Sequence, residues 1–526
     1  MFDLIIQNAL IYDGSGSAAF HGSVGINNGK IACVSRECLS GAVTVVDAEG
    51  LSLAPGFIDS HSHSDTCLYA DPHRLHVLRM GVTTEVAGQC GGSRSPAMDS
   101  MTDQTREFLA SKHSPFFPSM AEQLSAMENW ELGTNQRFFT GHNLLRGGAM
   151  QLTDRDATDD EIAVMQNALS RAIVEGSAGV STGLSYVPGI YSNTHELTEL
   201  GRTAGLCGGM YVTHSRSESM GLFDSVAECI HIAKEGNVPV NISHFKCVGK
   251  VFWERCEEAL SMIDKAIAEG ADITLDAYPY VAASTTTLSA IPPRFLDQGA
   301  VAFAKSLENP AIVEAIRKEI YEINDPSWDN SMYYVGLDNF LIVRAVNTPW
   351  AVGKTYAQAG EILGMDPFDA VIYLLKANDG QVNECRFSMC EENVEMILKH
   401  PKCMVGSDGI LNPGDVACHP RALGTFPRYL GHYIRDRKIL SREEGIHRIT
   451  GMPAKRYGLK GKGEIKEGCD ADLVLFDFDR IQDHADFIDP FKPNEGIHQV
   501  LIAGRCVLKD NEPTGLWLGK YIKSAK

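Results

Sequence analysis

The chain has 526 residues, 44% of them hydrophobic and 22% charged, a balance that is typical of a globular protein and argues against long disordered stretches. At this length, the usual domain size predicts roughly two to four domains. The 47 basic and 67 acidic residues give a formal net charge of −20. Because no local basic patch interrupts this acidic excess, the sequence argues against a nucleic acid or an anionic membrane as partner. The expected partner is a small molecule.

The start of the chain, residues 1–7, has the pattern of an amphipathic strand and lacks the basic region, apolar core and cleavage site of a signal peptide. No apolar run approaches the roughly 18 residues that a membrane-spanning helix needs. The 14 cysteines include no C-x-x-C pair and are expected to be mostly buried thiols in a reducing compartment. We therefore expect a cytoplasmic protein.

Short alternating strands are predicted at both ends of the chain. Near the start they cover 3–11, 22–26, 30–34 and 43–47, separated by turn signals. The same pattern returns near the other end, in 471–477 and around 500–509. The sequence therefore predicts that residues 1–54 and 459–526 form one small β-sandwich.

Between these ends, short apolar strands alternate with helical patterns, for example a helix over 160–175 followed by a strand over 178–181. Such alternation predicts a parallel sheet with helices packed outside it. Candidate ligands also recur at this spacing, since His61 and Cys90 are 29 residues apart and His214 and His244 are 30 apart. A (β/α)8 barrel brings the carboxyl ends of many strands to one site, whereas a doubly wound sheet usually draws on fewer strands. The α/β barrel is therefore favoured.

Residues from about 288 to 343 do not fit this alternation. Pro292-Pro293 introduces helices and an irregular strand before the barrel pattern resumes. We interpret the stretch as an insertion after a late strand, which could form a lid over the barrel mouth or an outward structural excursion.

Two imidazoles two residues apart open a series of candidate metal ligands. His61 and His63 follow an apolar segment, and on an extended strand both would point to the same side and could chelate one ion. Four further candidates end short apolar or small-residue runs, and they are Cys90, His214, His244 and Asp408. Strands that feed a barrel mouth would have this pattern, so the chain is predicted to be a metallohydrolase.

Each of these candidates also has a simpler interpretation. Cys90 could be a buried thiol in a glycine-rich turn, although a thiolate beside two metal ions would be deprotonated and could bridge them. His214 and His244 could be core histidines, and Asp408 could cap the helix that follows it. Two histidines at matching strand ends favour metal binding, and the position of Asp408 favours a catalytic carboxylate.

These residues resemble the amidohydrolase superfamily and, within it, the N-acyl-D-amino-acid deacylases, also called D-aminoacylases. The resemblance covers nearly the whole chain, with motifs at 55–63, 81–84 leading to Cys90, 181–186, 213–216, 242–247, 276–280, 407–409, 419–421 with 424–428, and 471–474. The H-x-H pair is common to the superfamily, whereas the cysteine and the segment 181–184 are more specific. In one departure near the expected pocket, Gly91-Gly92 replaces a more common Gly-Phe.

The resemblance implies a distorted (β/α)8 TIM barrel over residues 55–458, with a small β-sandwich and with zinc at the barrel mouth. The implied ligands are Cys90, His214 and His244 for one tight zinc, and His61, His63 and Asp408 for a weaker second site. Other branches of the superfamily bridge two metals with a carboxylated lysine, but the matching strand, 179–186, contains no lysine. Cys90 fits the bridging role, which favours this branch over dihydroorotase-like or hydantoinase-like enzymes.

The activity implied is hydrolysis of the amide bond of N-acyl-D-amino acids to a carboxylate and a free D-amino acid. Metal-bound hydroxide would attack the acyl carbonyl, because zinc lowers the pKa of bound water to about 7. Asp408 would act as general base and then as general acid, passing the proton to the leaving nitrogen. The resemblance points to Tyr186, Lys246 and Arg421 for the substrate carboxylate, with Tyr280 as a pocket wall.

Alternatives stay open for these assignments. Arg421 could form a surface salt bridge, Lys246 could be a solvated strand end and Tyr186 could be a core aromatic. The enzyme could also be a cyclic-amide or dipeptide hydrolase of the same superfamily, or the barrel could bind a metal or metabolite without catalysis. Asp408, present together with five other ligand candidates, argues against a non-catalytic barrel.

Overall fold

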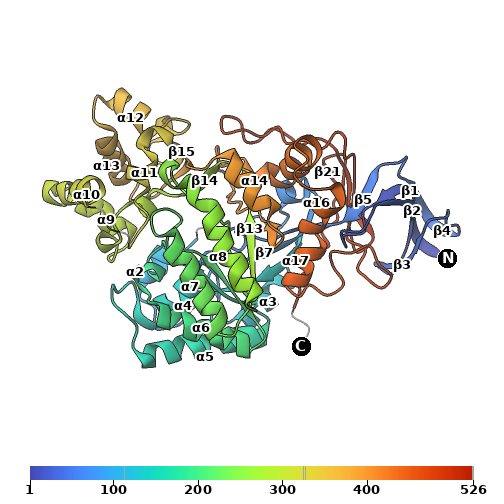
Figure 1. Ribbon diagram of the computed structural model, residues 1–526, viewed down its shortest axis with the longest axis horizontal. Coiled ribbons are helices and arrows are strands. Elements are labelled where there is room, and N and C mark those ends of the chain that lie inside the picture. The colour runs from blue at the N-terminus through green and yellow to red at the C-terminus, as the bar shows by residue number, and fades with distance from the viewer. Residues whose placement is uncertain (112, 324, 326, 524–526) are drawn as a thin grey trace.

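A ring of parallel strands forms the centre of the computed structural model, which describes residues 1–111, 113–323, 325 and 327–523 (Figure 1). In chain order the strands are β6 (Phe57–Asp59), β7 (Val82–Ala87), β8 (Asn135–Phe138) continued by β9 (Thr140–Gly141), β10 (Gly179–Gly183), β11 (Met210–His214), β12 (Val240–Ile242), β13 (Ile273–Ala277) and β17 (Cys403–Val405). They lie in two hydrogen-bonded sheets, β6-β7-β8 and β9-β10-β11-β12-β13-β17.

The two sheets close into one distorted barrel. The Ser60 amide donates to the Val405 carbonyl at 3.3 Å, and the Ala178 amide donates to the Phe138 carbonyl at 2.7 Å. All residues of β7, β10 and β13 are buried, as expected for parallel strands that are covered on both faces. The predicted barrel type is therefore present.

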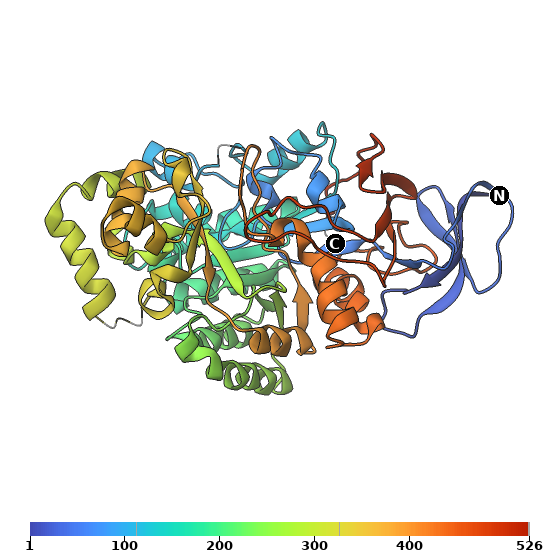
Figure 2. The ribbon, with the colours of Figure 1, turned by 90° about the horizontal axis from the view of Figure 1, so that it is seen from above.

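Helices cover the outside of the barrel (Figures 1 and 2). Four of the helices that lie between successive central strands are α5 (Asp159–Glu175), α6 (Thr194–Leu206), α7 (Leu222–Glu235) and α8 (Cys256–Ala268). Further helices include α1 (Leu75–Leu78), α2 (Asp103–Leu109), α3 (Met120–Met127), α4 (His142–Met150), α14 (Glu391–Lys399), α15 (Arg421–Arg428), α16 (Arg442–Arg448) and α17 (Gly451–Arg456). None of the helices in the described ranges combines the length and the apolar character that crossing a bilayer requires.

Helix α5 shows how local sequence sets these elements. Its first turn carries a capping box, in which Thr158 accepts from the Glu161 amide while the Glu161 side chain reaches back to Thr158. The helix ends at Gly176, whose φ of 137° is readily adopted only by glycine. The predicted helix over 160–175 and the strand after it are confirmed.

Both ends of the chain contribute to a nine-stranded sheet beside the barrel (Figure 2). Its strands are β1 (Phe2–Ile11), β2 (Phe20–Asn27), β3 (Lys30–Ser35), β4 (Ala42–Asp47), β5 (Ser52–Pro55), β18 (Leu473–Phe476), β19 (Ile497–Ile502), β20 (Arg505–Lys509) and β21 (Glu512–Pro513). Within this sheet, strands from the two ends pair where β5 lies antiparallel to β18. The sandwich itself, which requires two facing layers, stays a prediction.

The last described residues leave this sheet and return to the barrel. The Gly519 amide donates to the Leu132 carbonyl and the Ile522 amide to the Gln136 carbonyl, each at 2.8 Å. Tyr521 donates its hydroxyl to the Gly176 carbonyl at 2.8 Å. The described part of the segment proposed for the small domain, 459–523, thus reaches strand β8.

A separate unit lies between β13 and β17 and forms the end of the molecule opposite the nine-stranded sheet (Figures 1 and 2). It consists of the antiparallel strands β14 (Ala282–Thr286), β15 (Phe340–Ala345) and β16 (Val382–Phe387) with the helices α9 (Ala300–Ser306), α10 (Pro310–Glu322), α11 (Ser331–Val335), α12 (Tyr356–Leu363) and α13 (Pro367–Ala377). It has its own buried core, which includes Phe303, Phe340 and Phe368. The expected insertion, 288–343, lies inside this unit, which continues to β16.

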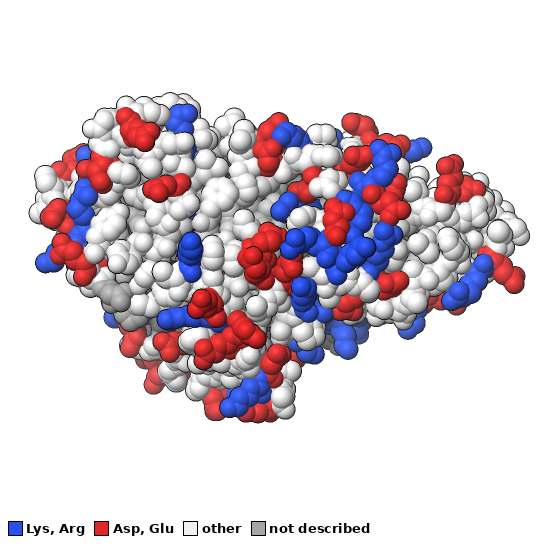
Figure 3. Space-filling model, turned by 45° about the horizontal axis from the view of Figure 1, so that its top comes forward, with Lys and Arg blue, Asp and Glu red and all other residues white. Residues whose placement is uncertain are grey.

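Basic and acidic side chains are intermixed on the face of the molecule in Figure 3. Lys and Arg side chains gather near the middle of this face, but acidic side chains lie among them. On this face the described residues therefore form no extended surface of one sign.

Phe57 connects the barrel to the nine-stranded sheet, and its loss should destabilise the protein. Its buried ring lies 6.1 Å from the Phe426 ring and 5.9 Å from the Phe476 ring, measured between centroids. We expect Phe57→Ala to lower the free energy of unfolding by about 3–5 kcal/mol, measured by urea denaturation. Val45→Ala is the matched control, because Val45 is 53% exposed and its loss should change that energy by less than about 0.5 kcal/mol. Equal effects of the two changes would contradict the prediction.

Candidate metal centre and active site

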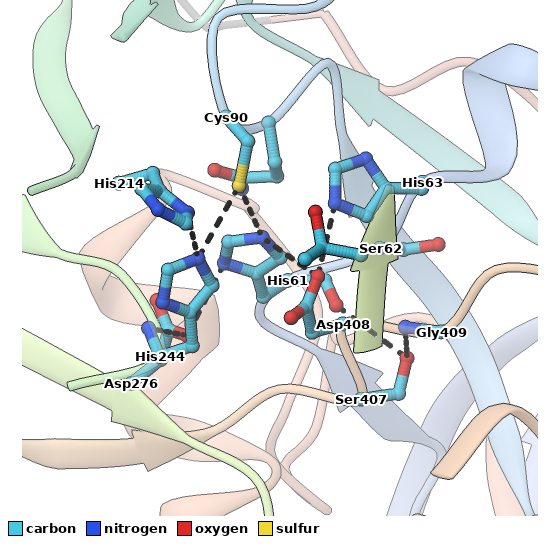
Figure 4. Close-up of polar contacts among 12 residues, drawn as sticks. His61, Ser62, His63, Cys90, His214, His244, Asp276, Ser407, Asp408 and Gly409 are labelled. Atoms are coloured by element: carbon cyan, nitrogen blue, oxygen red, sulfur yellow. Dashed lines mark hydrogen bonds and ion pairs between the residues drawn. The ribbon is translucent and has the colours of Figure 1, made fainter. Parts of the chain in front are cut away.

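The six predicted metal-binding residues meet at the carboxyl ends of the barrel strands (Figure 4). They are His61 and His63 after β6, Cys90 after β7, His214 at the end of β11, His244 after β12 and Asp408 after β17. Residues at or just after the ends of five different strands thus converge at the carboxyl-terminal face of the barrel, which is where barrel enzymes have their active sites.

Their ligand atoms form two groups that share Cys90. The first group is Cys90, His214 and His244, and the second is His61, His63, Cys90 and Asp408, with the ligand atoms of each group all within 4.8 Å of one another. Cys90 Sγ lies 3.4 Å from Nε2 of both His61 and His244. Nδ1 of His214 lies 2.9 Å from Nε2 of His244, and Asp408 Oδ1 lies 3.0 Å from Nε2 of His63. Each group could hold an ion, and Cys90 is the residue that the two groups share.

Three separations in these groups fit a metal ion, whereas the 2.9 Å between His214 and His244 and the 3.0 Å between His63 and Asp408 are hydrogen-bond distances. Ligands on a tetrahedral zinc, with Zn–N near 2.0 Å and Zn–S near 2.3 Å, lie about 3.3–3.6 Å from one another. The two S···N separations of 3.4 Å at Cys90 fall in that range, as does the 3.6 Å between Nε2 of His61 and Oδ1 of Asp408. Thiolate, imidazole and carboxylate are also the ligand types that zinc takes in proteins.

The backbone is left-handed at three of the six candidates. Cys90, His244 and Asp408 have φ values of 51°, 35° and 48°, which are uncommon for residues other than glycine. Backbone contacts hold two of them, because the Asp408 amide donates to the His61 carbonyl at 2.7 Å and the His244 amide donates to Asp276 Oδ1 at 2.8 Å. Such conformations cluster at functional sites, where the surrounding structure fixes them.

Burial and neighbouring charges set the protonation of these groups. Burial, together with Lys246, lowers the pKa of His214 and of His244 well below the ordinary value, so both rings are neutral and can donate a lone pair. Burial and the Asp408 carboxylate raise the pKa of the Cys90 thiol, and a cation at the site would favour its thiolate. Burial alone would raise the pKa of Asp408, but Arg421 and the nearby histidines lower it well below its usual range.

Two carboxylates that sequence reasoning missed stand behind the imidazoles. Asp276 Oδ1 lies 3.2 Å from Nδ1 of His61, and Glu218 Oε1 lies 3.1 Å from Nδ1 of His244. Carboxylates in this position orient a histidine ligand and increase its basicity. Asp276 could have been suspected, because it is an acid in the apolar strand β13, but nothing in the local sequence marks Glu218.

The residues expected to bind the substrate carboxylate occupy different environments. The ammonium of Lys246 donates to Glu218 Oε1 at 2.5 Å and lies 2.8 Å from Nδ1 of His244. Nη1 of Arg421 lies 2.8 Å from Asp408 Oδ2, so this arginine supports the candidate acid directly. Arg421 and Lys246 are both buried, which removes the surface salt bridge and the solvated strand end as interpretations.

The two tyrosines of segment 276–280 point to different neighbours. The Tyr280 ring lies 5.0 Å from the Arg428 guanidinium and 5.1 Å from the His419 ring. The Tyr278 ring instead lies 4.6 Å from the Arg421 guanidinium and 5.7 Å from the Lys246 ammonium. Sequence reasoning missed Tyr278, whereas the role given to Tyr280 stays a prediction.

The unit between β13 and β17 contributes to the wall of the site. Tyr186 Oη lies 3.0 Å from Thr285 Oγ1 on β14. Asp329 is partly buried and accepts hydrogen bonds from Ser217 Oγ, Ser219 Oγ and the Glu218 amide. The unit therefore holds the loop that carries Glu218.

Comparison with known proteins identifies the family. The Amidohydrolase family model matches residues 338–508. D-aminoacylase from Alcaligenes xylosoxydans xylosoxydans is 33% identical over 521 residues, which are 99% of this chain and 97% of that protein. N-acyl-D-aspartate deacylase from the same organism is 33% identical over 514 residues, which are 98% of this chain and 93% of that protein.

A solved structure extends the likeness to the whole fold. N-acyl-D-glutamate deacylase from Bordetella bronchiseptica, solved with zinc and a phosphonate inhibitor, has a TM-score of 0.84 and 29% identity and covers 99% of this chain and 100% of that one. The protein is an amidohydrolase and belongs to the family of the D-aminoacylases and N-acyl-D-amino-acid deacylases.

Proposed function

We propose that this protein is a zinc-dependent hydrolase that cleaves the amide bond of N-acyl-D-amino acids and releases a carboxylate and a free D-amino acid. The observation that carries the proposal is the double group of metal-type ligands around Cys90, with Asp408 and Arg421 paired beside it. The names of two relatives that are each 33% identical over nearly the full chain support the substrate class.

Zinc is the proposed metal, with a tight site at Cys90, His214 and His244 and a weaker site at His61, His63 and Asp408. Thiolate and neutral imidazole favour zinc over harder cations such as magnesium or calcium. When bound, zinc lowers the pKa of water to about 7 and polarises a carbonyl oxygen.

Asp408 is the proposed general base and acid. Its carboxylate stays ionised in spite of burial, because Arg421 lies 2.8 Å from Oδ2 and the nearby histidines also favour the charged form. Oδ1 lies 3.0 Å from Nε2 of His63 and 3.6 Å from Nε2 of His61, so this oxygen faces the two proposed histidine ligands (Figure 4). Asp408 accepts a proton from the attacking water and returns it to the leaving nitrogen, so that the product departs as a neutral amine.

The substrate carboxylate is proposed to bind beside Lys246, Arg421 and Tyr186, with Tyr278 and Tyr280 as aromatic walls. Lys246 and Arg421 are already paired with Glu218 and Asp408, so the substrate would join existing ion pairs instead of meeting free cations. This arrangement fixes both side chains in advance and lowers the entropic cost of binding.

Replacement of Asp408 tests the proposed chemistry. Zinc-loaded protein should release amine from N-acetyl-D-amino acids faster than from their L-enantiomers, with methionine, leucine, phenylalanine, glutamate and aspartate as the panel. Asp408→Asn should lower kcat by about 10²–10⁴-fold, because the proton relay is lost. The zinc of the tight site should stay bound, as measured by atomic absorption. Unchanged turnover would refute the role of Asp408, and turnover of dihydroorotate alone would favour the cyclic-amide alternative.

Substitution of Gly406 tests whether the position of His61 is required for metal binding. A Cβ at residue 406 would lie 2.4 Å from Cβ of His61 and 2.9 Å from its backbone nitrogen. Gly406→Ala should therefore displace His61 and lower the bound metal per chain. Gly92→Ala is the matched control, because its added Cβ would meet the Gln89 carbonyl oxygen at 3.6 Å, an ordinary contact. Equal metal contents in the two variants would argue against His61 as a ligand.

A further inference from the structure

A cavity of about 250 Å³ opens beside Cys90, and Lys246 is not among the described residues that line it. Its walls come from four parts of the chain, the segment from the loop after β7 to helix α2, the start of helix α4, the loop after β10, and the end of β14 with the segment after it. Apolar side chains such as Phe108, Leu109, Leu288 and Leu296 make up much of the lining. The cavity has room for several water molecules, so it can take a substituent much larger than a methyl group.

Arg94 is a charged residue in the otherwise largely apolar lining of this cavity. Of the described residues that line the cavity, it alone carries a fixed positive charge, and it is 5% exposed. Nη2 donates to the Leu109 carbonyl at 3.4 Å, whereas Nε and Nη1 have no hydrogen-bond partner in the described part of the chain. A buried guanidinium with unused donors is costly unless a ligand satisfies it.

Nearby protein groups compensate this charge only in part. Asp65 Oδ2 lies 3.9 Å from Nε, which is too long for a hydrogen bond. The Phe116 ring lies 4.9 Å from the guanidinium carbon and adds a weaker attraction. Burial lowers the pKa of Arg94 from its ordinary value in spite of Asp65, but an arginine remains charged at neutral pH. The position therefore attracts an anion.

We infer that this cavity binds a second carboxylate of the substrate, carried on a short apolar stem and recognised by Arg94. This inference rests on the proposed function, which places the scissile amide at Cys90 and the α-carboxylate beside Lys246 and Arg421, neither of which is among the described residues that line the cavity. The second carboxylate can come from a D-amino acid with an acidic side chain or from a dicarboxylic acyl group. Both sources present the same chemistry to Arg94, and a planar guanidinium can hold either through two parallel hydrogen bonds.

Arg94 also has an anchoring contact that the experiment must separate from ligand binding. Its carbonyl accepts from the Phe117 amide at 2.8 Å, and its side chain contacts the Leu109 carbonyl, so the residue helps to hold the segment between them. Loss of this anchor would impair all substrates alike. Loss of charge recognition would impair only substrates with the second carboxylate.

The test measures kcat and KM of the zinc-loaded full-length protein on two isosteric pairs. The first pair, N-acetyl-D-glutamate and N-acetyl-D-glutamine, differs in the charge of the amino acid side chain. The second pair, N-succinyl-D-leucine and N-succinamoyl-D-leucine, differs in the charge of the acyl group. The variants are Arg94→Met, which removes the charge, and Arg94→Lys, which keeps it. For any compound that is not hydrolysed, a calorimetric Kd takes the place of KM.

We expect the protein to prefer the carboxylate member of at least one pair. Arg94→Met should raise KM for that member about 10- to 100-fold and leave its amide partner within about threefold, and Arg94→Lys should restore part of the preference. The pair that responds identifies the source of the carboxylate.

Arg106→Met is the matched control. Arg106 anchors the same segment through the Met98 and Met101 carbonyls but does not line the cavity, so its loss should leave both preferences unchanged. No preference in either pair, or equal losses for both members in Arg94→Met, would overturn the inference. If the substrates are hydrolysed and Arg94→Met leaves the carboxylate preferences unchanged, the proposed function stands but the role of Arg94 is rejected. If the compounds bind with selective Kd values but are not hydrolysed, the carboxylate site in the cavity stands but the proposed function is rejected.

Discussion

Charge compensation in a buried space is the constraint on which this site depends. The carboxylates of Asp276, Glu218 and Asp408 and the thiol of Cys90 lie around one ammonium and one guanidinium. With Cys90 as a thiolate, the group carries two more negative than positive charges, and one divalent cation would bring its formal charge to zero. Because isolated buried charges are costly, the donor set and the proposed cation stabilise each other. The metal proposal thus rests on electrostatics as well as on ligand spacing.

The same constraint explains the unusual backbone at the site. Cys90, His244 and Asp408 all adopt left-handed conformations just beyond the ends of their strands. A regular strand would alternate its side chains between the two faces, so a turn at this position lets a side chain aim along the barrel axis. The cost is local strain of about 1–3 kcal/mol per residue, which the packed barrel beneath can offset.

Sequence reasoning reached the barrel and the candidate ligand residues because both leave a periodic signal. Apolar strands at intervals of one βα unit predicted the ring, and a polar side chain after each run marked the strand end. Glu218 and Arg94 leave no such signal, because both lie in loops and gain their surroundings from segments distant in sequence, such as Asp329 and Leu288. The unit between β13 and β17 was underestimated for a related reason, since its helices α12 and α13 have the same helical pattern as those of the barrel.

The barrel and the unit between β13 and β17 contribute different parts of the site. The candidate ligand atoms come from strand ends and loops of the barrel, whereas Thr285, Leu288 and Leu296 of the unit face Tyr186 and the cavity beside Cys90. Asp329, which also belongs to this unit, accepts a hydrogen bond from the backbone amide of Glu218. The Glu218 side chain in turn accepts one from the ammonium of Lys246, so Asp329 helps to position both residues. Substitutions in the unit can therefore reshape what the pocket accepts without touching a metal-type ligand. A metal centre fixed by the barrel and a wall supplied by a variable unit would allow related enzymes to share one reaction and differ in substrate.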